Sequence, residues 1–126
     1  MKHLFFAVTL TVFLFGVSLT CAELVRCRTQ EVADRLTLAQ AAAERADAEA
    51  ARRETKEAAA LWERHTPLLD ALVQHAEIDG VSGALAELEH YAGLEHPEEF
   101  LSRCARLLHD LRHIRDLELP LPQNVL

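Results

Sequence analysis

The sequence predicts an all-α protein, in which an N-terminal transmembrane or signal helix precedes a small antiparallel helical bundle built from helical hairpins. The 126 residues include 20 Ala and 22 Leu but only 4 Gly and 4 Pro, whereas β-sandwiches and barrels need frequent turns. The first apolar run is long and uncharged, and later apolar residues recur at helical spacing. We therefore divide the chain into residues 1–25, a membrane anchor or signal segment, and residues 26–126, a helical domain.

Residues 4–22 form an apolar run of 19 residues without a charged side chain, preceded by Lys2. As a helix the run is about 28 Å long, close to the roughly 30 Å of a bilayer core. We predict an uncleaved anchor, with a signal peptide cut after Ala22 as the alternative. A lipid-modified Cys21 is a third reading, but the residues before Cys21 form no leucine-led lipobox.

The membrane, reached through residues 4–22, is the first predicted partner. A short basic start before an apolar run is the usual export signature, so we expect a single-pass protein of the cell membrane with an extracytoplasmic helical domain. Arg26, Arg28 and Arg35 behind the run favour the opposite orientation. The net charge of −7 argues against nucleic acid as a partner, because phosphate binding needs clustered Lys and Arg.

Residues 29–65 contain neither Gly nor Pro and are rich in Ala, Glu and Arg, which predicts helix. A turn near Asp47, a suitable cap, would split this stretch into two helices. Arg53 and Glu57 interrupt the apolar repeat, so no sustained coiled coil is expected. A narrow seam that allows close approach of a second helix is predicted at Leu36, Ala39, Ala43, Ala46 and Ala50.

Thr66 and Pro67 predict a helix start, with a kink in one continuous helix as the alternative. The next helix is expected from about Ala84 to Ala92, with Gly93 as its stop. An apolar stripe before it is expected at Leu69, Leu72, Val73 and Ala76. The turn that separates stripe and helix is predicted at Asp79, Gly80, Ser82 and Gly83.

Pro97 predicts the start of the last helix, where Glu98 and Glu99 suit the positive end of the helix dipole. Pro120 and Pro122 would end it and extend the tail. Its apolar face comprises Phe100, Cys104, Leu107, Leu108, Leu111 and Ile114. These helices have apolar stripes too narrow for isolated stability, so they must pack against one another.

The helical domain holds two cysteines, Cys27 and Cys104. In an oxidising compartment they could pair and close a long loop. We favour the alternative, in which both are unpaired and Cys104 packs as a small core residue.

Short motifs follow one another in a definite order: Trp62, Leu69, His75-Ala76-Glu77-Ile78-Asp79, Leu85, Leu88, Tyr91, Glu99-Phe100, His113-Ile114 and Asn124-Val125-Leu126. In this order and spacing, nearly the whole chain resembles the bacterial family called domain of unknown function 4363. The resemblance implies a membrane-associated helical domain with a docked tail, and it implies no known activity. Two departures are Pro67, within an expected continuous helix, and a missing Gly near Asp47.

Four residues are candidate metal ligands. His75 and Asp79 are four apart and share one side of a helix, next to the predicted apolar stripe, so we expect them to be half-buried. There they could bind a metal or act as an acid–base pair. We favour a structural role, with His75 bonded to the turn and Asp79 capping the next helix. His109 and His113 have the spacing of a two-histidine metal site, but the helical wheel turns both toward solvent. We therefore expect no metal and no other cofactor.

No catalytic set is recognisable. Ser82 and Ser102, the serines beyond the membrane segment, lie in no nucleophile elbow, and no Gly-rich phosphate loop occurs. Trp62 is expected to anchor the core. The prediction is a non-enzymatic, membrane-tethered interaction module at the cell envelope, with a multi-pass membrane protein as a candidate partner. The alternative is an extracytoplasmic ligand- or metal-binding sensor that uses His75, Asp79, His109 and His113.

Overall fold

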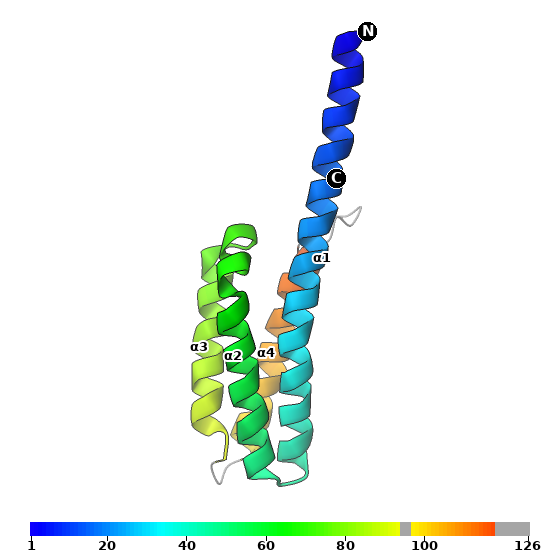
Figure 1. The fold of residues 1–126 in the computed structure, drawn as a ribbon. Helices are drawn as coiled ribbons and strands as arrows, with labels where there is room; N and C mark the ends of the chain where they lie inside the picture. The colour runs from blue at the N-terminus through cyan, green and yellow to red at the C-terminus, as the bar shows by residue number, and fades with distance from the viewer. Residues whose placement is uncertain (94–96, 118–126) are drawn as a thin grey trace.

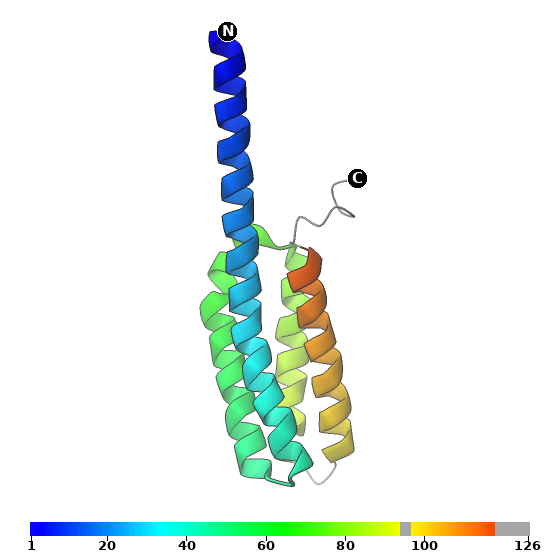
Figure 2. The ribbon, with the colours of Figure 1, turned by 90° about the vertical axis from the view of Figure 1, so that its right-hand side faces the viewer.

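The computed structural model of the chain describes residues 1–93 and 97–117, and these residues form four helices (Figure 1). The helices are α1 (Lys2–Glu44), α2 (Ala48–Leu72), α3 (His75–Tyr91) and α4 (Pro97–Leu117). Successive helices run antiparallel, and α1 packs against α2 and α4 (Figures 1 and 2). The helix α3 packs against the same two helices from the opposite corner. The predicted all-α hairpin bundle is therefore confirmed.

Each helix contributes one row of buried side chains, mostly spaced alternately three and four residues apart. This is the spacing of helices that pack knobs into holes in left-handed bundles. The rows on α1 and α2 contain several alanines, whereas those on α3 and α4 are mainly large. The rows are Ala22, Val25, Thr29, Val32, Leu36, Ala39 and Ala42; Ala51, Thr55, Ala58, Trp62, His65 and Leu69; Ile78, Val81, Leu85 and Leu88; and Phe100, Cys104, Leu107, Leu111 and Ile114.

The turn between α1 and α2 lies where the sequence predicts it. Asp47 is the N-cap of α2, and its Oδ1 accepts a hydrogen bond from the Ala50 amide at 3.1 Å. A cap of this kind satisfies an amide that the first helical turn leaves without a partner. Ala46 takes a φ of 60° to reverse the chain.

The predicted seam is right only in its first half. Leu36 and Ala39 are buried, but the row continues at Ala42, so Ala43 is only half-buried. Ala46 lies in the turn, and Ala50 is buried but belongs to α2. After the turn α2 begins a new row, so Arg53 and Glu57 fall outside it and are exposed. The chain reverses direction at the turn, and α2 packs antiparallel on α1. The spacing of buried residues along α1 therefore does not continue into α2.

Thr66 and Pro67 do not start a helix: that prediction is wrong, and α2 is one continuous helix through Pro67. Proline leaves the carbonyl four residues earlier without its helical donor. The Thr66 hydroxyl donates to the neighbouring Trp62 carbonyl at 2.7 Å, and the Pro67 ring is exposed. The helix therefore tolerates the proline on its solvent side.

The break between α2 and α3 comes earlier than predicted, at Val73 and Gln74, which are extended. The residues from Asp79 to Gly83, predicted to form a turn, lie inside α3, which begins at His75 and not near Ala84. A helical Gly costs about 1 kcal/mol relative to Ala. Burial of the α3 row outweighs that local cost. Ala76, expected in the stripe, is exposed.

The remaining boundaries agree with the sequence. Gly93 follows α3 with a φ of +84°, a conformation that only glycine adopts cheaply. The α4 helix begins at Pro97, with Glu98 and Glu99 in its first turn. Its predicted apolar face is buried, except that Leu108 is half-buried. Pro120, Pro122 and the tail from Asn124 lie outside the described residues.

Candidate functional site

The first part of α1 projects beyond the bundle as an isolated helix (Figures 1 and 2). Residues 1–20 are all exposed. Its length and composition suffice to span a membrane. The exposed large apolar side chains are Leu4, Phe5, Phe6, Val8, Leu10, Val12, Phe13, Leu14, Phe15, Val17 and Leu19.

Three threonine hydroxyls within this apolar segment are satisfied by the helix itself. Thr9, Thr11 and Thr20 each donate to the carbonyl four residues earlier, at 2.8 to 2.9 Å. In hydrocarbon an unpaired hydroxyl is costly because no water is present to replace the bond. The segment therefore presents an almost wholly apolar surface.

The apolar segment continues into the bundle core without a linker. Side chains are exposed as far as Thr20, and Ala22 already belongs to the buried row. The predicted domain boundary after residue 25 falls inside this uninterrupted helix. The first charged groups past the segment form ion pairs along α1, Glu23 with Arg26 and Arg28 with Glu31. The bundle is thus joined to the end of the apolar segment by one continuous helix.

A histidine lies inside the α1–α2 interface. His65 occupies the buried row of α2 between Trp62 and Leu69, and its Nε2 is 2.8 Å from Oε2 of Glu31 on α1. The hydrogen bond with His65, together with the attraction of Arg28 and of charge on His65, lowers the pKa of Glu31. Sequence reasoning missed this pair, although the three-four spacing around His65 places it in the core.

The Glu31–His65 pair predicts a pH-dependent stability. A carboxyl with a lowered folded pKa stabilises the fold above its ordinary pKa of 4.5, and the contribution is lost as the pH falls through the lowered value. We expect the full-length protein in detergent micelles to resist urea more than Glu31→Gln at pH 6. The difference should disappear on acidification.

Urea midpoints between pH 6 and pH 3, followed by Trp62 fluorescence, measure this difference. Glu63→Gln removes an exposed charge from α2 and controls for the change in net charge. A gap between wild type and Glu31→Gln that stays constant across this pH range would contradict the role of the pair.

The cysteines are free, and Cys27 and Cys104 lie too far apart to pair. Cys104 is buried in α4, and its Sγ donates to the Leu36 carbonyl at 3.4 Å. Leu36 is about 13 Å along α1 from Cys27, whereas the Cα atoms of a disulfide lie within about 7 Å. Burial raises the pKa of the Cys104 thiol to about 12, so it stays protonated and unreactive. The prediction of a buried, unpaired Cys104 is confirmed.

His75 and Asp79 lie on the surface, so the expectation that they are half-buried is wrong. Both precede the predicted start of α3 but belong to its first turns. His75 Nδ1 is 3.3 Å from Oδ1 of Asp70, which lies within α2 and not in the turn. Asp79 cannot cap a helix because it lies within one.

His109 and His113 are exposed on α4, as the helical wheel predicts. The structure does not combine them with His75 and Asp79 into one site. Within residues 1–93 and 97–117, no three His, Cys, Asp or Glu side chains are close enough together to hold a metal ion. The four candidate ligands thus form two separate exposed pairs.

The other residues of the family-like motifs are structural where they are described. Trp62 is 2% exposed, and its Nε1 donates to the Ser82 hydroxyl on α3 at 2.9 Å. Ile78 lies in the buried row of α3, and Glu77 is half-buried beside it. Trp62 is therefore the core anchor that the sequence predicts. Asn124 lies outside the described residues.

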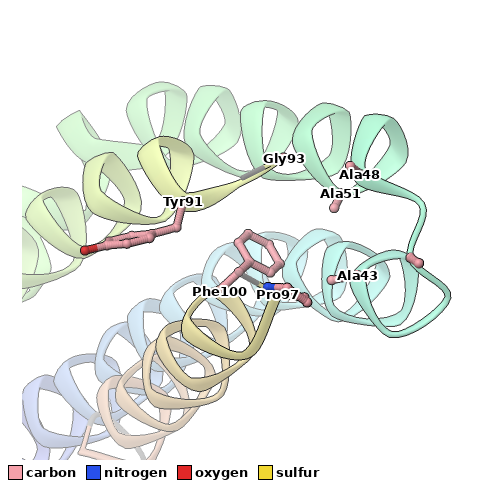
Figure 3. A pocket seen from close by; sticks show the side chains of 8 residues that line it. Ala43, Ala48, Ala51, Tyr91, Gly93, Pro97 and Phe100 are labelled. Atoms are coloured by element: carbon pink, nitrogen blue, oxygen red, sulfur yellow. The ribbon is translucent and has the colours of Figure 1, made fainter. Parts of the chain in front are cut away.

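A cavity of about 180 Å³ lies at the end of the bundle far from the apolar segment (Figure 3). The Tyr91 hydroxyl points away from the other lining side chains in Figure 3. The described lining residues thus offer space but no nucleophile, acid or base at the centre of the cavity. It consists of Ala43, Ala46, Ala48, Ala51, Tyr91, Gly93, Pro97 and Phe100.

Together these features define a class of protein: an antiparallel four-helix bundle continuous with an N-terminal helix long and apolar enough to cross a membrane. The chain belongs to the family Domain of unknown function (DUF4363), whose model matches residues 21–125. The match begins beside Ala22, where burial begins, so the described bundle lies within the family domain. The resemblance inferred from the motifs is confirmed. Comparisons with curated proteins and with solved structures give no significant match.

Proposed function

We propose that this chain is a membrane-anchored interaction module without catalytic activity. Residues 4–22 cross the cell membrane once, and the bundle stands outside the cytoplasm as a docking surface for another envelope protein. The observation that carries the proposal is the continuity of α1, in which an exposed apolar helix turns into a core helix at Ala22.

The side chains of α1 support an anchor. Residues 4–20 would be stable as an exposed helix only in a medium that solvates apolar surface, and their threonine hydroxyls need no water. Charged side chains resume at Glu23, immediately past the segment. Ala22 belongs to the buried row of α1. Cleavage after Ala22 by a signal peptidase would therefore remove a residue from the core of the bundle.

A binding role fits the chemistry of the bundle better than catalysis. The Cys104 thiol is buried and protonated, and the distal cavity has an apolar lining. Among the described residues after 20, Leu38 and Leu68 are the exposed large apolar side chains. A protein partner would therefore meet a mainly polar bundle surface, and a multi-pass membrane protein could also contact the apolar segment within the bilayer.

Fractionation of a full-length, C-terminally tagged protein tests the anchor. We expect the protein to keep its full mass of 14.1 kDa plus the tag and to stay in membranes after alkaline carbonate. Val12→Arg combined with Phe13→Arg should release it, because each central arginine costs about 2.5–3.5 kcal/mol on insertion scales. Val12→Leu with Phe13→Leu is the matched control. A released band that lacks the first 22 residues would contradict the anchor.

The same tagged protein tests orientation and interaction. In cells stripped of their wall, protease should digest the bundle while the membrane is intact. Protection that is lost only on detergent lysis would place the bundle in the cytoplasm. Crosslinking in these membranes should give a product larger than the monomer, and a monomer alone would contradict the interaction role.

A further inference from the structure

The end of the bundle nearest the apolar segment carries apolar side chains of its own. Leu68 on the last turns of α2 is 37% exposed, and Leu72 and Val73 at the α2–α3 turn are half-buried. Beyond residue 20, Leu38 is the other large apolar side chain that is exposed in the described part of the chain. The exposed Leu68 therefore lies one helical turn before Leu72 and Val73, next to the α2–α3 turn.

Contacts between α1 and α2 show which residues of α1 lie at the same height along the bundle axis as this turn. Arg35 Nη1 is 3.1 Å from Oε2 of Glu54, and His65 Nε2 is 2.8 Å from Oε2 of Glu31. Antiparallel helices have equal rise, so each step forward on α2 matches one step backward on α1. Leu72 lies 18 residues past Glu54 and 7 past His65. It is therefore level with α1 between about residues 17 and 24.

That range contains the end of the apolar segment, at Ala22. Figures 1 and 2 both show the α2–α3 turn beside α1, at the end from which the bare helix projects. We propose that this turn rests on the membrane surface, with Leu68, Leu72 and Val73 inserted among the lipid headgroups and upper acyl chains. The inference deepens the proposed function and rests on it, since the membrane is placed by the span of residues 4–22.

The charges at this end favour an apolar contact with lipid over an electrostatic one. Glu23 pairs with Arg26 and Arg28 with Glu31 on α1, and Asp70 pairs with His75 across the turn. Arg26 and Arg28 each pair with an acidic side chain, so this described part of α1 presents no unpaired arginine cluster that would select anionic headgroups. Three aliphatic side chains suffice for this lipid contact, because the membrane-spanning part of α1 already holds the bundle at the membrane surface, where the effective concentration of these side chains is high.

Depth-dependent fluorescence quenching tests this placement in the full-length chain. Cys21→Ser and Cys27→Ser leave only the buried, unreactive Cys104. The protein is reconstituted in phosphatidylcholine vesicles after an environment-sensitive label is attached to a new cysteine. We expect the label at Leu68→Cys to be blue-shifted and to be quenched by lipid with a doxyl group at acyl carbon 5.

Two further labels serve as references. Leu38→Cys is the matched control, since Leu38 is also exposed but lies about 24 Å beyond Ala22 along α1, so its label should stay unquenched. Val12→Cys reports the span and should be quenched most by lipid with a doxyl group at carbon 12. Including phosphatidylglycerol should not increase quenching at Leu68→Cys.

The outcomes separate the inference from the proposed function. Quenching at Val12→Cys without quenching at Leu68→Cys would leave the span intact and overturn the contact of the turn. Equal quenching at Leu38→Cys and Leu68→Cys would mean that the bundle lies on its side, which also overturns the inference. No quenching at Val12→Cys would overturn the span and the inference with it. Quenching at Leu68→Cys that requires phosphatidylglycerol would overturn the apolar contact.

Discussion

Trp62→Ala should lower the free energy of unfolding by about 3–5 kcal/mol, the usual cost of removing a large aromatic side chain from a core. Trp62 is 2% exposed and is the single Trp of the chain. The bundle has few other large side chains that could close the space, because the neighbouring rows of α1 and α2 contain several alanines. Thermal unfolding of the full-length protein in detergent micelles, followed by circular dichroism, measures the loss.

Two variants separate packing from hydrogen bonding at this position. Ser82→Ala removes the acceptor of the Trp62 Nε1 bond and should cost about 0.5–1.5 kcal/mol, the net value of a typical hydrogen bond, because Ser82 is exposed and water can replace its hydroxyl. Trp62→Phe keeps most of the aromatic volume and should fall between the two. A melting temperature for Trp62→Ala equal to that of the wild type would contradict its role as the core anchor.

Ala58→Leu should destabilise the bundle by about 1–3 kcal/mol through overpacking. Ala58 is 0% exposed in the α2 row, and α1 contributes Ala39 and Ala42 to the same core. Small side chains permit close approach of the two helices, and an added isobutyl group would force them apart. Urea unfolding followed by Trp62 fluorescence measures the effect.

Ala60→Leu is the matched control, two residues away on the same helix but exposed. Ala and Leu both favour helix strongly, so this exposed change should stay within about 0.5 kcal/mol. Equal effects of Ala58→Leu and Ala60→Leu would show that the three-four register described for α2 is wrong.

Helix boundaries could be predicted where a nearby side chain or backbone conformation causes them. Asp47 caps α2 with its own carboxylate, Gly93 adopts a positive φ, and Pro97 begins α4. The break at Val73 and Gln74 lacks such a marker. The stretch from Asp79 to Gly83 contains turn residues and is nevertheless helical, because Ile78 and Val81 are buried there.

The polar residues likewise divide into those whose position follows from local sequence and those whose position depends on distant contacts. The solvent-facing position of His109 and His113 follows from helical periodicity alone, so the sequence predicts it. The partner of His65 is Glu31, which lies 34 positions away along the chain, and no local spacing reveals that contact. His75 was predicted to be half-buried because the turn before α3 was placed too late.

The sequence by itself determined the helical class, the apolar segment of residues 4–22 and the family, since these depend on composition, periodicity and the order of short motifs along the chain. Only the tertiary structure decided that α1 continues from the apolar segment into the core, that α2 passes through Pro67, and that the α2–α3 turn lies level with the end of that segment. These features depend on burial between residues far apart in the chain, and burial outweighs the weak local preferences of Gly, Pro and Thr.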